Sequence, residues 1–222
     1  MRRVIISLIW SMLSAAAVSA GPWPREKGEF FVATTGTYFY GLESELIQSD
    51  GALYAEYGLS DRLTLGVSAM DNLYDYTHAY AFIRRAFSPP EQRLKFAASI
   101  GLGTSRRWLD WGAMARVDVS VGRSTTILKP GWWSVTAAIE DHAVWSAPTY
   151  KLDATFGLNL TDRIKTFVDV ETSHRSGSPQ TRTLRTSLAW KTGRGAHLLF
   201  GIEAKDSAER LIGLRAGWWR SF

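Results

Sequence analysis

The sequence predicts an all-β protein, a transmembrane antiparallel up-and-down β-barrel of about twelve strands. The first reason is the end of the chain, which stops on Phe222. Apolar residues occupy alternate positions before it: Trp218, Ala216, Leu214 and Ile212. Arg220 is the one departure from this pattern, and the intervening positions are small or charged: Gly213, Arg215 and Gly217. A strand of this kind places one side against lipid and the other against a watery lumen.

The second reason is that no long apolar run follows Ala20. Backbone polar groups in lipid can be satisfied only within a helix or a closed sheet, so any later membrane spanning must use strands. Aromatic residues make up 13% of the chain and include 10 Trp, which fits the aromatic girdles of a membrane barrel. The predicted location is therefore the bacterial outer membrane.

The N-terminus predicts a cleaved signal peptide over residues 1–20, followed by one barrel domain over residues 21–222. Arg2 and Arg3 precede an apolar run from Val4 to Val18, and small residues follow at Ser19 and Ala20. The alternative is a retained anchor helix, but the run is shorter than the ~20 residues that a spanning helix needs.

Composition restricts the chemistry. The chain has no Cys, which excludes disulfides and thiolate catalysis. Its net charge is +5, and it becomes +3 when Arg2 and Arg3 leave with the signal peptide. Because the basic residues are also scattered, we expect no nucleic-acid partner. No cofactor is expected.

The first six predicted strands are separated by turn signals and loops. They cover residues 29–40, 52–58, 63–70, 79–87, 93–103 and 111–122. A tight turn at residues 59–62 separates the second strand from the third. Pro89 and Pro90 end the fourth strand, because proline cannot continue a central strand. The sixth strand shows clear alternation: Arg116 and Asp118 lie on one side, and the other side carries Ala113, Ala115, Val117, Val119 and Val121.

The last six predicted strands cover residues 132–142, 150–160, 164–172, 181–191, 196–204 and 211–222. Short polar turns separate them at residues 161–163 and 192–195. Residues 150–160 alternate most clearly, with Leu152, Ala154 and Phe156 on one side and Lys151 and Asp153 on the other. A soluble sandwich strand can alternate too. The even strand count, the short turns and the terminal Phe222 favour the barrel.

An even count returns both termini to one side, the periplasm. Short extracellular loops are then expected at residues 41–51, 71–78, 104–110, 143–149, 173–180 and 205–210. The outer aromatic belt would hold Tyr38, Tyr40, Tyr74, Tyr76, Trp108, Trp111, Trp145 and Tyr150. The inner belt would hold Phe30, Tyr57, Phe87, Trp133, Trp190, Trp218 and Phe222. The faces of the first and fourth strands stay ambiguous.

The alternation collects charged residues of both signs on the face opposite the apolar one. They are Glu56, Lys95, Arg116, Asp118, Glu140, Lys151, Asp153, Lys165, Asp169, Glu171, Arg185, Glu203 and Arg215. Such residues could line a path for a small solute and set weak charge selectivity. They could equally pair across strands and only hold and fill the barrel. No substrate-specific pattern marks the solute.

Two alternatives to a channel remain. His174 and Ser176 lie two positions apart and would both point outward, and a His that activates a Ser is the basis of acyl hydrolysis, so an outer-leaflet lipid hydrolase is possible chemistry. Neither an acid nor an oxyanion donor is assignable, so a polar loop is the preferred interpretation and no enzyme is predicted. A structural or adhesive surface barrel is the other alternative.

Histidines raise the question of a metal site. His78, His142 and His174 fall near the predicted outer ends of three strands, close to acidic residues. A metal site needs three or four converging ligands. Solvated loop histidines are the preferred interpretation, and no metal is predicted.

Three segments carry a family resemblance. They are residues 23–29 (WPREKGE), the hairpin at residues 57–66 (YGLSDRLTLG) and the terminal Phe222. Together they resemble small Gram-negative outer-membrane barrels, above all the uncharacterised group associated with the phenol meta-pathway transporters. The resemblance implies a transport-like protein among outer-membrane lipids and lipopolysaccharide. Trp218 and Phe222 would be its assembly signal for the barrel-assembly machinery. The leading hypothesis is a monomeric small-solute channel.

Overall fold

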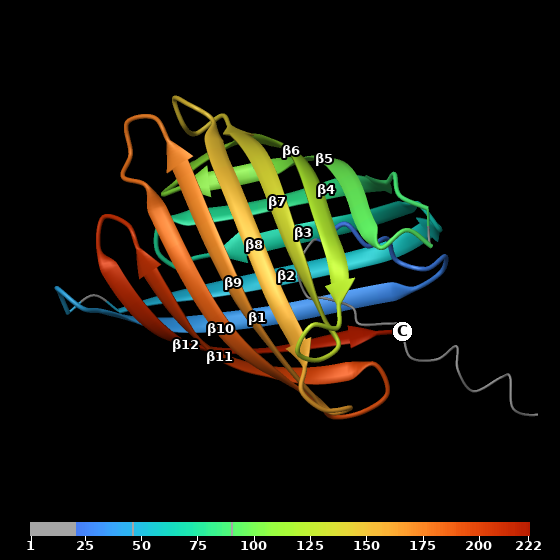
Figure 1. Ribbon diagram of the computed structural model, residues 1–222. Coiled ribbons are helices and arrows are strands. Elements are labelled where there is room, and N and C mark those ends of the chain that lie inside the picture. Colours follow the sequence, from blue (N-terminus) through green and yellow to red (C-terminus); the bar gives the residue numbers. More distant parts are fainter. Residues whose placement is uncertain (1–20, 46, 90) are drawn as a thin grey trace, which may run out of the picture.

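The computed structural model describes residues 21–45, 47–89 and 91–222, and these form a closed barrel of twelve antiparallel strands (Figure 1). The strands follow one another around the barrel in chain order. Their bounds are β1 Phe30–Gly41, β2 Ile47–Ser60, β3 Leu63–Asp71, β4 Tyr76–Ala86, β5 Leu94–Arg107, β6 Asp110–Thr125, β7 Gly131–His142, β8 Thr149–Asn159, β9 Ile164–Arg175, β10 Thr181–Lys191, β11 Ala196–Asp206 and β12 Arg210–Ser221. The predicted fold class and strand count are confirmed.

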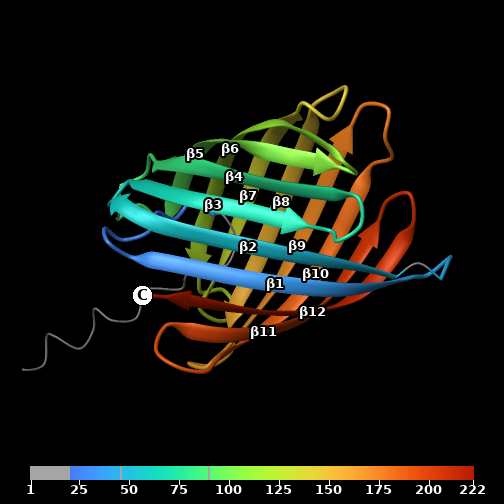
Figure 2. The same cartoon turned by 180° about the vertical axis from the view of Figure 1, so that it is seen from behind.

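The first and last strands form the seam that closes the barrel (Figure 2). β1 pairs with β12 from Phe31 opposite Ser221 to Gly41 opposite Leu211, and its other edge pairs with β2. At one end of the seam, the Phe30 and Phe222 main chains bond to each other, and their rings lie 5.8 Å apart. Every strand therefore has two hydrogen-bonded neighbours, which a membrane interior requires.

Two ends of the barrel are used as reference points below. The terminal end is where β1 begins and β12 stops, and the C-terminus is marked there in Figure 1. The turns after β2, β4, β6, β8 and β10 also lie at this end. The far end carries the turns after β1, β3, β5, β7, β9 and β11.

Several strands extend beyond the predicted bounds at the far end, so the loops there are shorter than expected. β2 begins at Ile47, not at residue 52, and β5 continues to Arg107. Residues 48–50 are Gln, Ser and Asp and show no apolar alternation, yet they pair with Phe39, Tyr38 and Thr37 of β1. Alternation is needed only where a strand meets lipid, whereas ladder hydrogen bonds can extend a hairpin past it.

Large apolar side chains cover the outside of the barrel. Leu214 is 73% exposed and Leu102 is 67% exposed, and both lie on the outward side of their strands. Strands of 9 to 16 residues are comparable to the ~9–11 residues that a tilted strand needs to cross a bilayer. Among the described residues, no helix is long and apolar enough to span a membrane.

Most of the predicted belt aromatics are exposed near the two ends. At the far end these are Tyr38, Tyr40, Tyr74, Trp108, Trp111 and Tyr150. At the terminal end they are Phe30, Tyr57, Phe87, Trp190 and Phe222, while Trp133 and Trp218 are half-buried. Tyr76 and Trp145 correct the prediction, because both line a cavity inside the barrel. Tyr76 lies on the same side of β4 as the buried His78, which alternation could not decide for this strand.

Candidate functional site: the interior of the barrel

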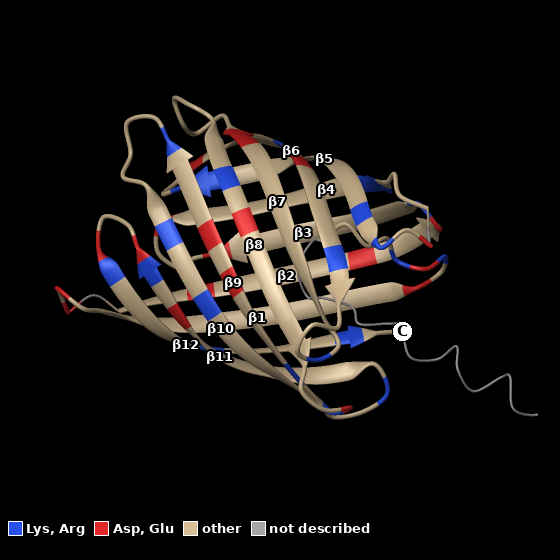
Figure 3. Cartoon of the chain, in the orientation of Figure 1, with Lys and Arg blue, Asp and Glu red and all other residues tan. Residues whose placement is uncertain are grey.

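The inward side of the strands carries all thirteen charged residues named from the sequence. Eleven belong to the wall within the barrel, and Lys95 and Lys165 lie near the terminal end. Lys95 Nζ donates to the Pro89 carbonyl oxygen at 2.9 Å. Basic and acidic residues are neighbours on β8, β9 and β10 (Figure 3). Three groups of ion pairs account for most of them.

The Glu56 group joins β2, β4 and the N-terminal segment. Glu56 is 2% exposed and forms ion pairs with Arg84 and with Arg25, whose Nε lies 2.5 Å from Glu56 Oε2. Tyr54 Oη donates to Glu56 Oε1 at 2.6 Å and accepts from Arg84 Nη2 at 2.8 Å. The carboxylate is thus held by three donors, which compensates the cost of burying its charge.

The Glu140 group joins β6, β7 and β8. Glu140 is paired with Arg116 and with Lys151, whose Nζ lies 3.0 Å from Glu140 Oε2. Arg116 Nε donates to Asp118 Oδ2 at 3.0 Å, and Ser99 Oγ donates to the same oxygen at 2.6 Å. Each charge in this group has an opposite charge within contact distance.

The Arg185 group joins β9, β10, β11 and β1. Arg185 Nη2 donates to Glu171 Oε2 at 2.9 Å, and Arg185 Nε donates to Glu203 Oε1 at 3.0 Å. Thr37 Oγ1 also donates to Glu203, at 3.0 Å. This group crosses the seam between β12 and β1, so the polar lining continues around the point where the barrel closes.

An aromatic cluster fills the interior nearer the terminal end. It contains Phe31, Trp132, Phe167 and Trp219, together with Ala33, Ala189 and Leu199. The Phe167 ring lies 6.4 Å from Trp132 and 6.2 Å from Trp219. Gly157 lies opposite both Trp132 and Phe167 in the ladder, and a Cβ there would come within 2.2 Å of the Trp132 ring. This glycine gives the rings the room to meet.

The N-terminal segment, residues 21–29, folds into the terminal end and is called the strap below. The Arg25 amide donates to Thr64 Oγ1 at 3.1 Å, and the Arg25 guanidinium lies 4.1 Å from the centre of the Phe31 ring. The Gly28 amide bonds to the Gly58 carbonyl at 2.8 Å. Trp23 packs against the aromatic cluster. The strap is therefore bound both to the Glu56 group and to the cluster.

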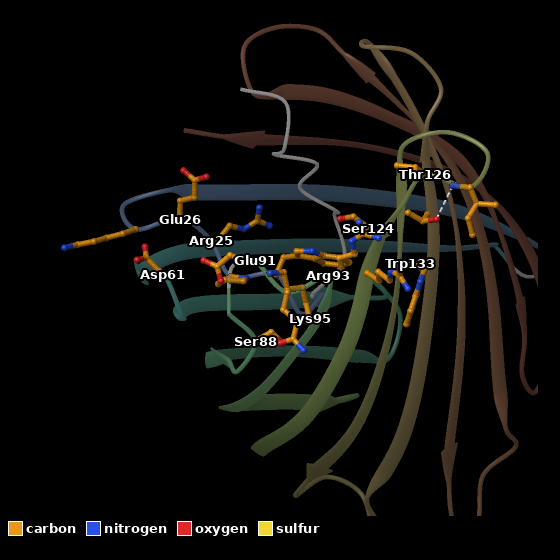
Figure 4. A pocket seen from close by; sticks show the side chains of 17 residues that line it. Arg25, Glu26, Asp61, Ser88, Glu91, Arg93, Lys95, Ser124, Thr126 and Trp133 are labelled. Atoms are coloured by element: carbon orange, nitrogen blue, oxygen red, sulfur yellow. Dashed lines mark hydrogen bonds between the residues drawn. The ribbon is translucent and has the colours of Figure 1, made fainter. Parts of the chain in front are cut away.

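Two neighbouring cavities lie inside the barrel, and a third lies at its terminal end. The far vestibule, about 430 Å³, is lined by Tyr76, His142, Trp145, Lys151 and Arg175 among others. The middle cavity, about 150 Å³, shares Arg185 and Arg215 with it. The terminal mouth, about 1200 Å³, is bordered by the strap and by the turns after β2, β4 and β6 (Figure 4). The aromatic cluster separates the middle cavity, lined by Trp132 and Phe167, from the terminal mouth, lined by Trp23.

The far end of the vestibule carries a basic pair. The guanidinium of Arg107 lies 4.3 Å from the centre of the Trp145 ring, and that of Arg175 lies 3.5 Å from it. Among the described residues, neither arginine has an ion pair with an acid. The entrance at this end therefore holds two positive charges that no described acid pairs with.

Several interior residues were not found from the sequence. Arg84 belongs to a strand whose face alternation left open. The register gives a usable signal, because Phe82 lies opposite Gly66 and Gly101, and a Cβ on Gly66 would come within 2.3 Å of its ring. Glycines on both sides of an aromatic residue mark the inward face, which also places Arg84 inside.

His78 and His142 correct the prediction of solvated loop histidines. His78 is 7% exposed, and His142 is 2% exposed and lies 3.4 Å from both Glu140 and Tyr76. Among the described residues, no group of three or more His, Asp or Glu side chains is placed to hold a metal ion.

The proposed hydrolase pair lies outside the interior. His174 is exposed on the outward side of β9, opposite Tyr150, and Ser176 lies in the turn after the strand. Ser178, not His174, is the partner of Arg175 in this turn, with Arg175 Nη2 3.0 Å from its Oγ. No observation here supports acyl hydrolysis.

Similarity to solved structures agrees with this architecture. The COG4313 outer membrane channel from Pseudomonas putida F1 has a TM-score of 0.63 and 11% identity, covering 93% of this chain and 100% of that chain. The KdgM porin has a TM-score of 0.61 and 10% identity, covering 86% and 99%. The translocator domain of the autotransporter NalP from Neisseria meningitidis has 0.51 and 10%, covering 89% and 90%.

No protein-family model matches the chain, and no curated protein is significantly similar to it in sequence. The structural likeness shows the fold, which is that of bacterial outer-membrane β-barrels. The resemblance to the phenol meta-pathway group stays a prediction.

Proposed function

We propose that this protein is a channel for small polar solutes in the bacterial outer membrane, and that the conformation described here is closed near the terminal end. The supporting observation is that two cavities inside the barrel share lining residues, while a third lies at the terminal end beyond the aromatic cluster and the strap. A polar wall inside a barrel is costly unless its groups are paired or meet a polar solute, and Arg215 and Asp153 are not paired with any described residue.

The orientation follows from the usual topology of such barrels. The terminal end faces the periplasm, and the far vestibule opens to the outside. Residues 1–20, the predicted signal peptide, lie outside the described residues. The outward rows of apolar side chains would contact outer-membrane lipid and lipopolysaccharide. Trp218 and Phe222 would guide assembly by the barrel-assembly machinery.

The named neighbours are consistent with a solute path. One KdgM porin structure is described in complex with a disordered oligogalacturonate, so a barrel of this fold can accommodate a solute. The free space inside the barrel is smaller than the backbone suggests, because charged pairs occupy much of the wall. A solute would therefore have to be small.

Conductance in planar bilayers tests this proposal. The wild-type channel should conduct in rare, brief openings, because Trp23 and Arg25 hold the strap against the cluster and the Glu56 group. The double variant Trp23→Ala/Arg25→Ala should remain open for longer and conduct more. Lys27→Ala is the matched control, since Lys27 is exposed in the same segment. A folded wild type and double variant that both stay silent would refute the channel.

A further inference from the structure

The middle cavity holds two unpaired side chains of opposite charge. Arg215, on β12, forms no ion pair or hydrogen bond with any described residue, and its Nη1 is fully buried. Asp153, on β8, likewise has no hydrogen bond or ion pair among the described residues, and it lines the same cavity. The two do not pair with each other. Other arginines of the wall, such as Arg84, Arg116 and Arg185, all have carboxylate partners.

The floor of the cavity adds an apolar surface and one more donor. Trp132 and Phe167 line it, and both belong to the aromatic cluster. The indole Nε1 of Trp132 is buried without a hydrogen-bond partner. Buried polar groups in native proteins are nearly always satisfied, so the two buried donors without partners among the described residues, together with the unpaired Asp153 on the same cavity, point to an occupant.

From these groups we infer that the middle cavity is a binding site for a small zwitterion of the apolar α-amino-acid class. The ligand carboxylate would accept from Arg215 and Trp132, its ammonium would face Asp153, and its side chain would rest on Trp132 and Phe167. This inference rests on the proposed function, because it names the solute class of that same path.

Charge complementarity excludes the simpler ligands. A simple anion would face Asp153 and Asp169, and a simple cation would face Arg185 and Arg215. A ligand with both charges satisfies both sides of the cavity, whereas either charge alone leaves one side repelled and buried. The volume of about 150 Å³ equals that of an engineered protein cavity that binds benzene. Leucine is near the upper limit of this size.

Access is from the far vestibule, which shares Arg185 and Arg215 with the middle cavity. A solute drawn in at the far end therefore meets the site before it reaches the aromatic cluster. The site is the last polar position on that route.

Calorimetric titration of the refolded barrel in detergent tests the inference with three probes of similar shape. L-leucine carries both charges, isocaproate lacks the ammonium, and isoamylamine lacks the carboxylate. Leucine should bind at least about tenfold more tightly than either of the others, since each lacks one charged contact. Equal binding of leucine and either probe would overturn the inference, as would no binding of leucine.

Two variants give a crossed pattern that misfolding cannot mimic. Arg215→Gln should weaken leucine about tenfold and strengthen isoamylamine, and Asp153→Asn should weaken leucine and strengthen isocaproate. Neither substitution leaves another described side chain without its ion-pair or hydrogen-bond partner, so both variants should fold. The controls are Arg182→Gln and Asp162→Asn, exposed residues on the far and terminal sides. Variants that leave leucine affinity unchanged would refute the site.

Conductance measured on the same preparations separates the two proposals. A conducting barrel that does not bind leucine removes the zwitterion site and leaves the channel. A barrel that binds leucine with the crossed pattern but never conducts removes the channel and retains the site.

Discussion

The two halves of the barrel interior are built differently from the same strands. On β7, β9 and β12 the inward positions are charged and paired toward the far end, and toward the terminal end they are aromatic and packed. On β9 the inward side changes from Glu171 to Phe167, and on β12 it changes from Arg215 to Trp219. On β7 it changes from Glu140 to Trp132. Alternation decides which way a side chain points. The residue type at each inward position decides whether the lumen there is lined by polar groups or filled by packed rings.

The two halves also use space differently. Arginine and glutamate side chains reach across neighbouring strands, as Arg84 reaches Glu56 over β3. Aromatic rings instead need small neighbours, as Trp132 and Phe167 need Gly157. The charged part of the wall is therefore stable only when each charge has its partner. The aromatic cluster can pack only where glycines leave room for its rings.

The largest expected effect is on the buried ion pairs of the Glu56 group. Glu56→Gln should lower the free energy of unfolding by about 3–5 kcal/mol, because it leaves Arg84 and Arg25 buried without their carboxylate. Urea unfolding in liposomes measures this. The control is Glu43→Gln, which removes an ion pair with Arg210 whose side chains are 52% and 63% exposed, and it should leave the free energy of unfolding nearly unchanged. Equal effects would show that burial does not distinguish the two pairs.

A smaller effect is expected on the aromatic half. Gly157→Ala should destabilise the barrel by about 1–3 kcal/mol, because the new methyl group forces the Trp132 ring to move. The near-ultraviolet circular dichroism of the tryptophans should change with it. Gly36→Ala is the control, since a Cβ there would meet nothing closer than 3.8 Å. An unchanged spectrum for Gly157→Ala would mean that the cluster is loosely packed.

The smallest effect should be on selectivity at the far entrance. The double variant Arg107→Gln/Arg175→Gln should reduce the anion-to-cation permeability ratio roughly twofold, because it removes two charges that no acid neutralises. Reversal potentials in a salt gradient measure the ratio. Arg182→Gln, exposed on the outward side of β10, should leave the ratio unchanged. A ratio that stays constant in the double variant would place the selective step deeper in the barrel.

The sequence predicted the directions of side chains better than their partners. Alternation placed Glu140 and Lys151 on one face, but only the register shows that they meet across β7 and β8. It could not decide β4, where Tyr76, Tyr80 and Phe82 all lie on the inward side, so Arg84 and His78 were missed. The paired glycines around Phe82 would have settled that face.

The sequence also failed to predict the position of the residues before the first strand. Trp23 and Arg25 carried a family resemblance, but nothing in their spacing indicated that they fold back into the barrel. Their position depends on contacts with Glu56 and Thr64, which come from distant parts of the chain. Periodicity reports local direction and contains no information about such contacts.

The seam has a consequence for how this molecule is made. Thr37 bonds to Glu203, 166 residues later, and β1 cannot find its second neighbour until β12 has been synthesised. Joining such distant segments carries a large loop-closure entropy and is slow. Until that step, two bare strand edges remain available to other chains. A chain that ends before β12 cannot close the barrel, so a truncated copy of this polypeptide is prone to aggregate.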